Sequence, residues 1–397
     1  MTPVPIVAAA LGLVSAAAAA PPRTVTLPFT LDHNRMIAEA EFLRPDGSLR
    51  KALAWVDTGN QFLMLGEGLA RELGLDVPAR REAGAQYEIA RASRTPGVRL
   101  AGLALATEGV VTKILVGARS MPGVPAEANL PATLLLGHRV VFDYPAGRIT
   151  VAGPGPAGGR GVAIPCRVNP ETGLFEIEAT LDGEPVRLGV DNGSSYTWVS
   201  ATLTTAWLAR HREWSHAIGA VGAANFFGFD FETTGVLVRL PEVGLGPLRA
   251  RGVGVLGIPQ ALFDWYSAKS AGAVAGFLGA NVLRGFRVEV DYPSRMTYWE
   301  PGRSPSPHDL DTVGVTLRPE ANGAFTVVGV AAKGGKPAAE GVVAGDTLLR
   351  VESLDTTGAS MGAVADALRG TPGARRTLVL ERAGHCVAVE TAVVRFP

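Results

Sequence analysis

The sequence predicts a mainly β protein with two similar lobes, followed by a smaller α+β unit. The chain has 397 residues, enough for two or three domains, and it contains 49 Gly and 28 Pro with only 19% charged residues. This composition is typical of a turn-rich β protein. A second observation is that five landmarks occur twice, in the same order, between about residue 25 and residue 300. The repeat indicates two lobes related by a pseudo-twofold axis.

Each copy begins with a predicted β-hairpin. In the first copy, apolar and polar residues alternate over 36–42, and a Pro45-Asp46-Gly47 turn leads into a strand that ends at Asp57. In the second copy, alternation over 175–181 is followed by Asp182-Gly183 and by a strand that ends at Asp191. Alternation with turn residues between the strands favours a hairpin.

The later landmarks follow at a different spacing. Leu134-Leu135-Leu136-Gly137 is echoed by Ala275-Gly276-Phe277-Leu278-Gly279, and Asp-Tyr-Pro occurs at 143–145 and 291–293. The copies are offset by 134 residues at the acids (191 − 57) and by 148 at Asp-Tyr-Pro (291 − 143). The second lobe therefore carries an insertion after its acid. Short helices are expected at 66–75 and near 200–211, at matching places in the two copies.

Both hairpins end in an acid with a Gly two positions later. The two segments read Asp57-Thr58-Gly59 and Asp191-Asn192-Gly193-Ser194. An acid at the end of a buried strand is costly unless it is paired or takes part in chemistry. Because the two acids hold the same place in a repeated unit, the sequence predicts a carboxylate pair across the pseudo-twofold axis.

These segments resemble the retropepsin-like (pepsin-type) aspartic proteases, here with both lobes in one chain. The resemblance implies that Asp57 and Asp191 are catalytic and that the neighbouring loop residues support the dyad: Thr58, Gly59, Asn192, Gly193 and Ser194. It also implies that two apolar segments pack behind the acids: Leu135-Leu136-Gly137 and Phe277-Leu278-Gly279. Ser194 is expected to donate to the outer oxygen of Asp191, with Asn60 at the matching place in lobe one.

Asn192 departs from the family pattern, which has Thr or Ser at this place. In the family, that hydroxyl bonds across to the opposing loop and aligns the acids. An amide both donates and accepts but is longer. Two functions therefore stay open: an exported aspartic endopeptidase, and a catalytically silent peptide-binding protein with a degenerate second half-site.

If the dyad is active, its chemistry follows from two close carboxylates. Like charges at short range share one proton and titrate together. The ionised acid activates a water molecule, and the protonated acid polarises the peptide carbonyl and protonates the leaving nitrogen. No cofactor or metal is expected, and the six His residues show no ligand spacing. Flaps over the cleft are expected at 84–89 and 219–225, where ordinary surface hairpins are the alternative.

Residues 311–397 resemble a PDZ domain of the bacterial protease-associated type. The resemblance is carried by 325–330, 337–346, 348–351 and a helix containing Val364, Ala365 and Leu368. It implies a C-terminal peptide ligand bound as an added strand, with Gly323, Ala324 and Phe325 as the carboxylate-binding loop. A docked domain without a ligand is the alternative. The Pro-rich linker at 303–310 predicts few contacts between this domain and the lobes.

Charge and the N-terminal segment bear on partners and location. Lys plus Arg equals Asp plus Glu at 37 each, so no net field favours nucleic acid or an anionic membrane. Residues 1–20 are Ala-rich and uncharged, which predicts a signal peptide and a periplasmic or secreted protein; an N-terminal anchor is the alternative. No later segment has the 18 uninterrupted apolar residues of a span. The expected boundaries are 1–20, lobe one 21–152, a linker 153–160, lobe two 161–302, a linker 303–310 and the PDZ-like domain 311–397.

Overall fold

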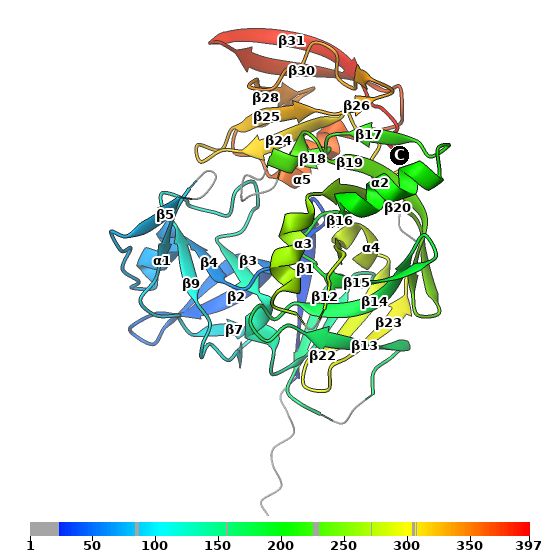
Figure 1. Ribbon diagram of the computed structural model, residues 1–397. Helices are drawn as coiled ribbons and strands as arrows, with labels where there is room; N and C mark the ends of the chain where they lie inside the picture. The colour runs from blue at the N-terminus through cyan, green and yellow to red at the C-terminus, as the bar shows by residue number, and fades with distance from the viewer. Residues whose placement is uncertain are drawn as a thin grey trace, which may run out of the picture.

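The computed structural model describes residues 24–83, 87–155, 158–224, 230–270, 272–303, 306 and 308–397. The fold is mainly β, as predicted. We call residues 24–152 lobe one, 161–302 lobe two and 311–397 the C-terminal unit. In Figure 1, lobe one (blue to cyan) and lobe two (green to yellow) lie side by side, and the C-terminal unit (orange to red) lies across the top. The predicted signal peptide lies outside the described residues.

Lobe one contains the predicted hairpin of β2 and β3, paired from Met36↔Val56 to Leu43↔Leu49. In its turn, Asp46 Oδ1 accepts a hydrogen bond from Ser48 N at 2.9 Å, and Gly47 has a φ of +82°. The elements of lobe one are β1 (Thr24–Asp32), β2 (Arg35–Leu43), β3 (Leu49–Asp57), β4 (Leu63–Gly66), α1 (Glu67–Glu72), β5 (Arg81–Ala83), β6 (Glu88–Arg91), β7 (Val98–Leu100), β8 (Leu103–Ala104), β9 (Thr112–Leu115), β10 (Ala128–Pro131), the 3-10 helix η1 (Ala132–Leu135), β11 (Arg139–Asp143) and β12 (Arg148–Ala152).

Lobe two repeats this hairpin as β14 and β15, paired through Thr180↔Pro185 and Leu181↔Glu184. The predicted helix after the second acid is α2, whose first turn is capped by Ser200 Oγ accepting from Thr202 N at 3.1 Å. The elements are β13 (Val162–Val168), β14 (Phe175–Leu181), β15 (Glu184–Val190), β16 (Thr197–Ser200), α2 (Ala201–Arg210), β17 (His216–Ile218), β18 (Gly222–Ala223), η2 (Asp230–Glu232), β19 (Val236–Leu245), β20 (Leu248–Ile258), α3 (Gln260–Ser267), β21 (Gly276–Leu278), α4 (Ala280–Leu283), β22 (Phe286–Asp291) and β23 (Met296–Pro301).

The lobes share one sheet and one hydrophobic core. β11 pairs antiparallel with β22, from Arg139↔Asp291 to Asp143↔Arg287, so the two strands that precede the Asp-Tyr-Pro turns meet at the lobe boundary. β12 and β1 extend this sheet into lobe one, and β23 and β13 extend it into lobe two. A single cluster of buried side chains includes residues of both lobes. This continuous sheet fixes the position of each lobe relative to the other.

The strand behind the first acid is not the predicted one. β10 runs parallel to β3 with Leu130 opposite Val56, as β21 runs parallel to β15 with Leu278 opposite Val190. Leu134 and Leu135 instead lie in η1, and Gly137 follows it. The expected partner segment, Leu135-Leu136-Gly137, was therefore wrong by several residues. Pro131 in lobe one takes the place that Gly279 takes in lobe two, so lobe one lacks the apolar-apolar-Gly pattern at this strand. The same pattern occurs a few residues later, at Leu135-Leu136-Gly137, where it is not part of the strand.

The C-terminal unit has its own small core, built around buried residues such as Phe325, Val327, Leu348, Val364 and Leu378. Its elements are β24 (Val315–Pro319), β25 (Phe325–Val330), β26 (Ala332–Lys333), β27 (Lys336–Pro337), β28 (Thr347–Val351), β29 (Leu354–Asp355), α5 (Met361–Leu368), β30 (Arg375–Arg382) and β31 (His385–Ala392). Within the described residues, no helix has the length and apolar composition needed to span a bilayer.

The expectation of few contacts between this unit and the lobes is wrong. β26 pairs with β17, and β18 of lobe two pairs with β24. Leu310, at the end of the expected linker, is 1% exposed, and Phe396 is 2% exposed; both lie in a cluster with side chains of lobe two. On the other side, Met361 N donates to Gly123 O of lobe one at 2.8 Å. The Pro-rich composition of the linker did not reveal these contacts because they are made by strand edges and by α5.

Candidate active site

The two acids at the ends of the duplicated hairpins face each other. Asp57 is the last residue of β3, and Asp191 directly follows β15. A Cβ placed on Gly59 would lie 2.5 Å from Asp191 Cγ, and a Cβ placed on Gly193 would lie 2.1 Å from Asp57 Oδ1. Each carboxyl group thus packs on the glycine of the opposite loop, at a distance that no larger residue allows. The structure brings together the two acids and the two glycines that the sequence predicted.

The two carboxyl groups accept hydrogen bonds in similar but unequal ways. Asp57 Oδ1 accepts from Gly59 N at 3.0 Å, and its Oδ2 accepts from Asn129 Nδ2 at 2.8 Å. Asp191 Oδ1 accepts from Gly193 N at 2.9 Å and from Ser194 N at 3.2 Å. Asn129 is the asymmetric element, because a side-chain amide reaches only Asp57.

Burial raises the pKa of both acids. For Asp191, the charge of Asp57 raises the pKa further. For Asp57, the hydrogen bonds from Asn129 and from Gly59 oppose the rise. Since hydrogen bonds to a carboxylate favour its ionised form, a single proton on the pair is favoured on Asp191.

The residues after each acid connect the two loops. Thr58 Oγ1 donates to Val190 O at 2.8 Å and accepts from Asn192 N at 3.0 Å. In the other direction, Asn192 Oδ1 accepts from Thr58 N at 2.8 Å. Asn192 therefore supplies the acceptor that a hydroxyl would supply. Its Nδ2 is buried and has no acceptor among the described residues.

The expected hydrogen bond from the Ser194 hydroxyl to Asp191 is not formed. Its hydroxyl donates to Tyr196 O at 2.6 Å, and only its backbone amide reaches Asp191. Asn60, at the matching place in lobe one, donates from Nδ2 to Asn129 Oδ1 at 2.7 Å. The short loop geometry directs both side chains away from the carboxyl groups.

Two residues near the dyad were missed by sequence reasoning. Asn129 is 3% exposed in the otherwise apolar strand β10. A polar residue within an apolar run could have indicated from the sequence that Asn129 is a site residue. Tyr266, in α3, donates from its hydroxyl to Gly59 O at 3.0 Å. Burial raises the pKa of Tyr266, and the charges of Asp191 and Asp57 raise it further, so the phenol stays protonated as a donor. Tyr266 lies in the part of lobe two without a counterpart in lobe one, where the repeat gives no guidance.

The two predicted flap segments have different surroundings. Gly84-Ala85-Gln86 lies outside the described residues, and the following strand, β6, pairs with β5 and β9. In the second segment, β18 pairs in parallel with β24, and Ala224 N donates to Leu317 O at 2.8 Å. Asn225 lies outside the described residues. The described part of this segment is therefore attached to the C-terminal unit.

The predicted peptide-binding loop lies in the turn between β24 and β25. Gly323 N donates to Glu320 O at 3.0 Å, and Ala324 N donates to Asn322 Oδ1 at 3.0 Å. Phe325 opens β25, where it pairs with Pro319. Because the amides of Gly323 and Ala324 have acceptors within their own turn, we assign no peptide carboxylate to this loop. Across the residues that the structure describes, no three His, Cys, Asp or Glu side chains converge on a possible metal position.

Comparison with known proteins gives a similarity of shape alone. No protein-family model matches the chain, and no curated protein matches its sequence. Among solved structures, the crystal structure of aspartic proteinase from Irpex lacteus is similar, with a TM-score of 0.43 and 11% sequence identity over 70% of this chain and 98% of that chain. A similarity at this level concerns overall shape, and the chemistry proposed below rests on the site alone.

Proposed function

We propose that this protein is an aspartic-type peptidase that hydrolyses peptide bonds with Asp57 and Asp191. The observation that carries the proposal is the close packing of each carboxyl group on the opposite glycine, at Gly193 and Gly59. Two carboxyl groups that are only partly exposed to solvent and that each pack against the opposite acid loop are costly for stability alone. Perturbed titration of paired acids is typical of catalytic sites.

The unequal hydrogen bonding assigns the roles. Asp57, which accepts from Asn129, is the ionised acid and takes a proton from the attacking water. Asp191 is the protonated acid: it donates to the carbonyl oxygen of the scissile peptide bond, so that water adds to the carbonyl carbon. The leaving nitrogen then receives the proton taken up by Asp57, and not the proton of the initially protonated acid as expected from the sequence, while the carbon–nitrogen bond breaks. The carbonyl re-forms with return of the first proton to Asp191.

Export is a separate part of the proposal. It is supported by the uncharged, Ala-rich residues 1–20. N-terminal sequencing of the protein recovered outside the cytoplasm tests it, with cleavage near Ala20 as the expected result. Peptide docking on the C-terminal unit is not proposed, because β18 already lies along β24.

Digestion of a peptide library over a range of pH tests the peptidase proposal. Asp57→Asn and Asp191→Asn are each expected to abolish cleavage while the free energy of unfolding holds or rises, because each removes the cost of burying two like charges. Asp46→Asn, in the exposed turn before β3, is the matched control and should retain activity. Residual cleavage in both dyad variants would assign the activity elsewhere. Peptide binding without cleavage by the unaltered chain would instead support the catalytically silent alternative.

A further inference from the structure

Helix α5 connects the C-terminal unit to both lobes, with one lobe contacted at each end. At its start, Gly362 N donates to Asp32 Oδ1 of lobe one at 3.2 Å. Just after its last residue, Arg369 Nη2 donates to Tyr196 OH of lobe two at 2.8 Å. The second contact joins a charged donor to a partly buried phenol, and a charged donor makes it one of the stronger kinds of hydrogen bond.

Tyr196 belongs to the loop that carries the second acid. Ser194 lies between them: its amide donates to Asp191 Oδ1, and its hydroxyl donates to Tyr196 O at 2.6 Å. The backbone of Tyr196 also packs closely against Gly279, because a Cβ on Gly279 would lie 2.2 Å from Tyr196 O. A shift of Tyr196 would therefore be transmitted to the amide that holds Asp191.

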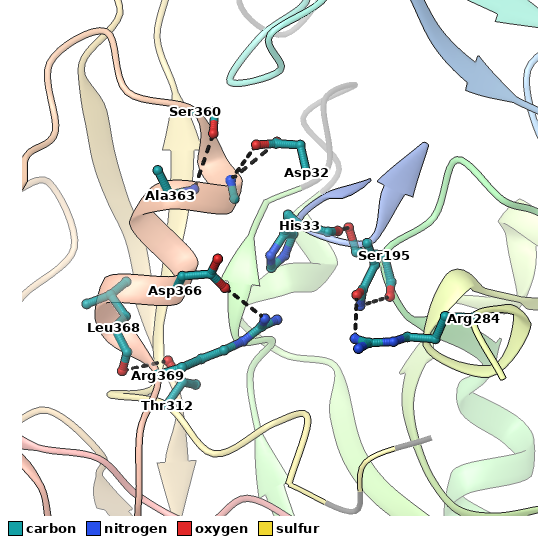
Figure 2. Close-up of polar contacts among 12 residues, drawn as sticks. Asp32, His33, Ser195, Arg284, Thr312, Ser360, Ala363, Asp366, Leu368 and Arg369 are labelled. Atoms are coloured by element: carbon teal, nitrogen blue, oxygen red, sulfur yellow. Dashed lines mark hydrogen bonds and ion pairs between the residues drawn. The ribbon is translucent and has the colours of Figure 1, made fainter. Parts of the chain in front are cut away.

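The turn between β1 and β2 supports the same loop. His33 and Asn34 form a two-residue turn with φ values of +48° and +67°, between β1 and β2. Ser195 Oγ donates to His33 O at 2.5 Å, and Asn34 Nδ2 donates to Ser195 O at 3.0 Å. Figure 2 shows this turn between α5 and Ser195, with Asp32 directed toward the start of the helix. Lobe one and α5 thus enclose the second acid loop from two sides.

We propose that Arg369 is a positioning residue for Asp191, and that the C-terminal unit completes the second acid loop through the hydrogen bond from Arg369 to Tyr196. This inference rests on the proposed function for its catalytic consequence. It makes the C-terminal unit part of the active-site scaffold. Arg369 itself touches neither acid.

Three variants of the full chain separate this role from general stability. Arg369→Met keeps an extended apolar side chain and removes the donor. Tyr196→Phe removes the acceptor and keeps the ring that packs edge-on against His33, with centroids 5.6 Å apart. Arg382→Met is the matched control, because Arg382 pairs with Asp346 at 2.7 Å within the C-terminal unit.

Amide hydrogen exchange over residues 192–196 is the first measurement and needs no peptidase activity. Faster exchange is expected in Arg369→Met and in Tyr196→Phe, and unchanged exchange in Arg382→Met. Peptide turnover is the second measurement: both interface variants should lower kcat on the order of tenfold with little change in KM, and the double variant should lose no more than either single variant.

The outcomes distinguish the two proposals. Faster loop exchange in a chain that cleaves no peptide would uphold the positioning inference and remove the proposed function. Unchanged exchange in Tyr196→Phe, the variant least able to disturb folding, would overturn the inference even if the unaltered protein is an active peptidase. If Arg369→Met detaches the C-terminal unit, Tyr196→Phe alone decides between these results.

Discussion

At the scale of single residues, the most informative side chain is Asn192. It occupies the place of a hydroxyl, and it supplies the acceptor for Thr58 N while its own Nδ2 is left without an acceptor among the described residues. A buried donor without a partner lowers stability by about 1–3 kcal/mol. The amide at this position is therefore tolerated by the loop geometry and still has a cost.

Asn192→Thr should remove this cost. A Thr hydroxyl accepts from Thr58 N and can donate to a backbone oxygen, so the free energy of unfolding should rise by about 1 kcal/mol and peptide turnover should be kept or increased. Urea unfolding and peptide digestion measure the two effects. In Thr58→Val, which loses both the donor to Val190 O and the acceptor for Asn192 N, both quantities should fall. A less stable Thr variant would show that the amide makes a bond that a hydroxyl cannot replace.

At the scale of elements, the two lobes differ in the strand behind each acid. β10 carries Asn129 opposite Trp55 of β3, and β21 carries Phe277 opposite Gly189 of β15. The same place in the repeat thus holds an amide in lobe one and an apolar ring in lobe two. Because of this difference, the two acids of the dyad are not equivalent, and the ionised form is favoured at Asp57.

Asn129→Leu should make the pair more symmetric. Removal of the hydrogen bond that lowers the pKa of Asp57 should raise that pKa. Because the proposed mechanism requires ionised Asp57, the acidic limb of kcat/KM against pH should move to higher pH, and activity should fall most at the acidic end. A pH profile of peptide cleavage measures the shift. An unchanged acidic limb would mean that Asp57 is not the group that must ionise.

At the scale of the whole molecule, His33 lies where the two lobes and the C-terminal unit meet. It is 5% exposed, and its ring nitrogens have no hydrogen-bond partner among the described residues. Its ring meets Tyr196 of lobe two, and a Cβ on Gly222 would lie 3.0 Å from it. Burial lowers the pKa of His33 well below its ordinary value, and the nearby charges of Arg369 and Arg35 lower it further.

Because His33 is buried where the two lobes and the C-terminal unit meet, we expect the contact between them to weaken at acidic pH. Above the ordinary His pKa of 6.5, neutral His33 does not lower the free energy of unfolding. As the pH falls below 6.5 toward the lowered pKa, the unfolded chain binds a proton more readily than the folded chain, and the free energy of unfolding falls by about 1.4 kcal/mol per pH unit. Limited proteolysis of the C-terminal unit and urea unfolding, each at about pH 7.5 and about pH 5, measure the change. His33→Asn, which tolerates the positive φ of the turn, should lose less stability over the same interval. An equal loss in both proteins would assign the acid sensitivity to other groups, such as His138, whose pKa is also lowered by burial.

Features that depend on local pattern could be predicted from the amino-acid sequence. Alternating residues and turn residues specified both hairpins, and helices α1 and α2 lie within the ranges expected for them, because these signals act over a few residues. The pairing of Asp57 with Asp191 was predictable because duplication places equivalent residues about one axis. Such a duplication is visible in a single sequence as a repeat of the same residues in the same order.

Contacts that join distant segments without a repeat could be found only from the folded chain. The partner strand of β3 was misplaced because Pro131 interrupts the pattern, and Tyr266 lies in a part of lobe two that lobe one does not repeat. The contacts of α5 with Asp32 and Tyr196 join residues separated by 330 and 173 positions, respectively. Neither periodicity nor composition encodes such contacts, because they depend on which surfaces meet after each unit has folded.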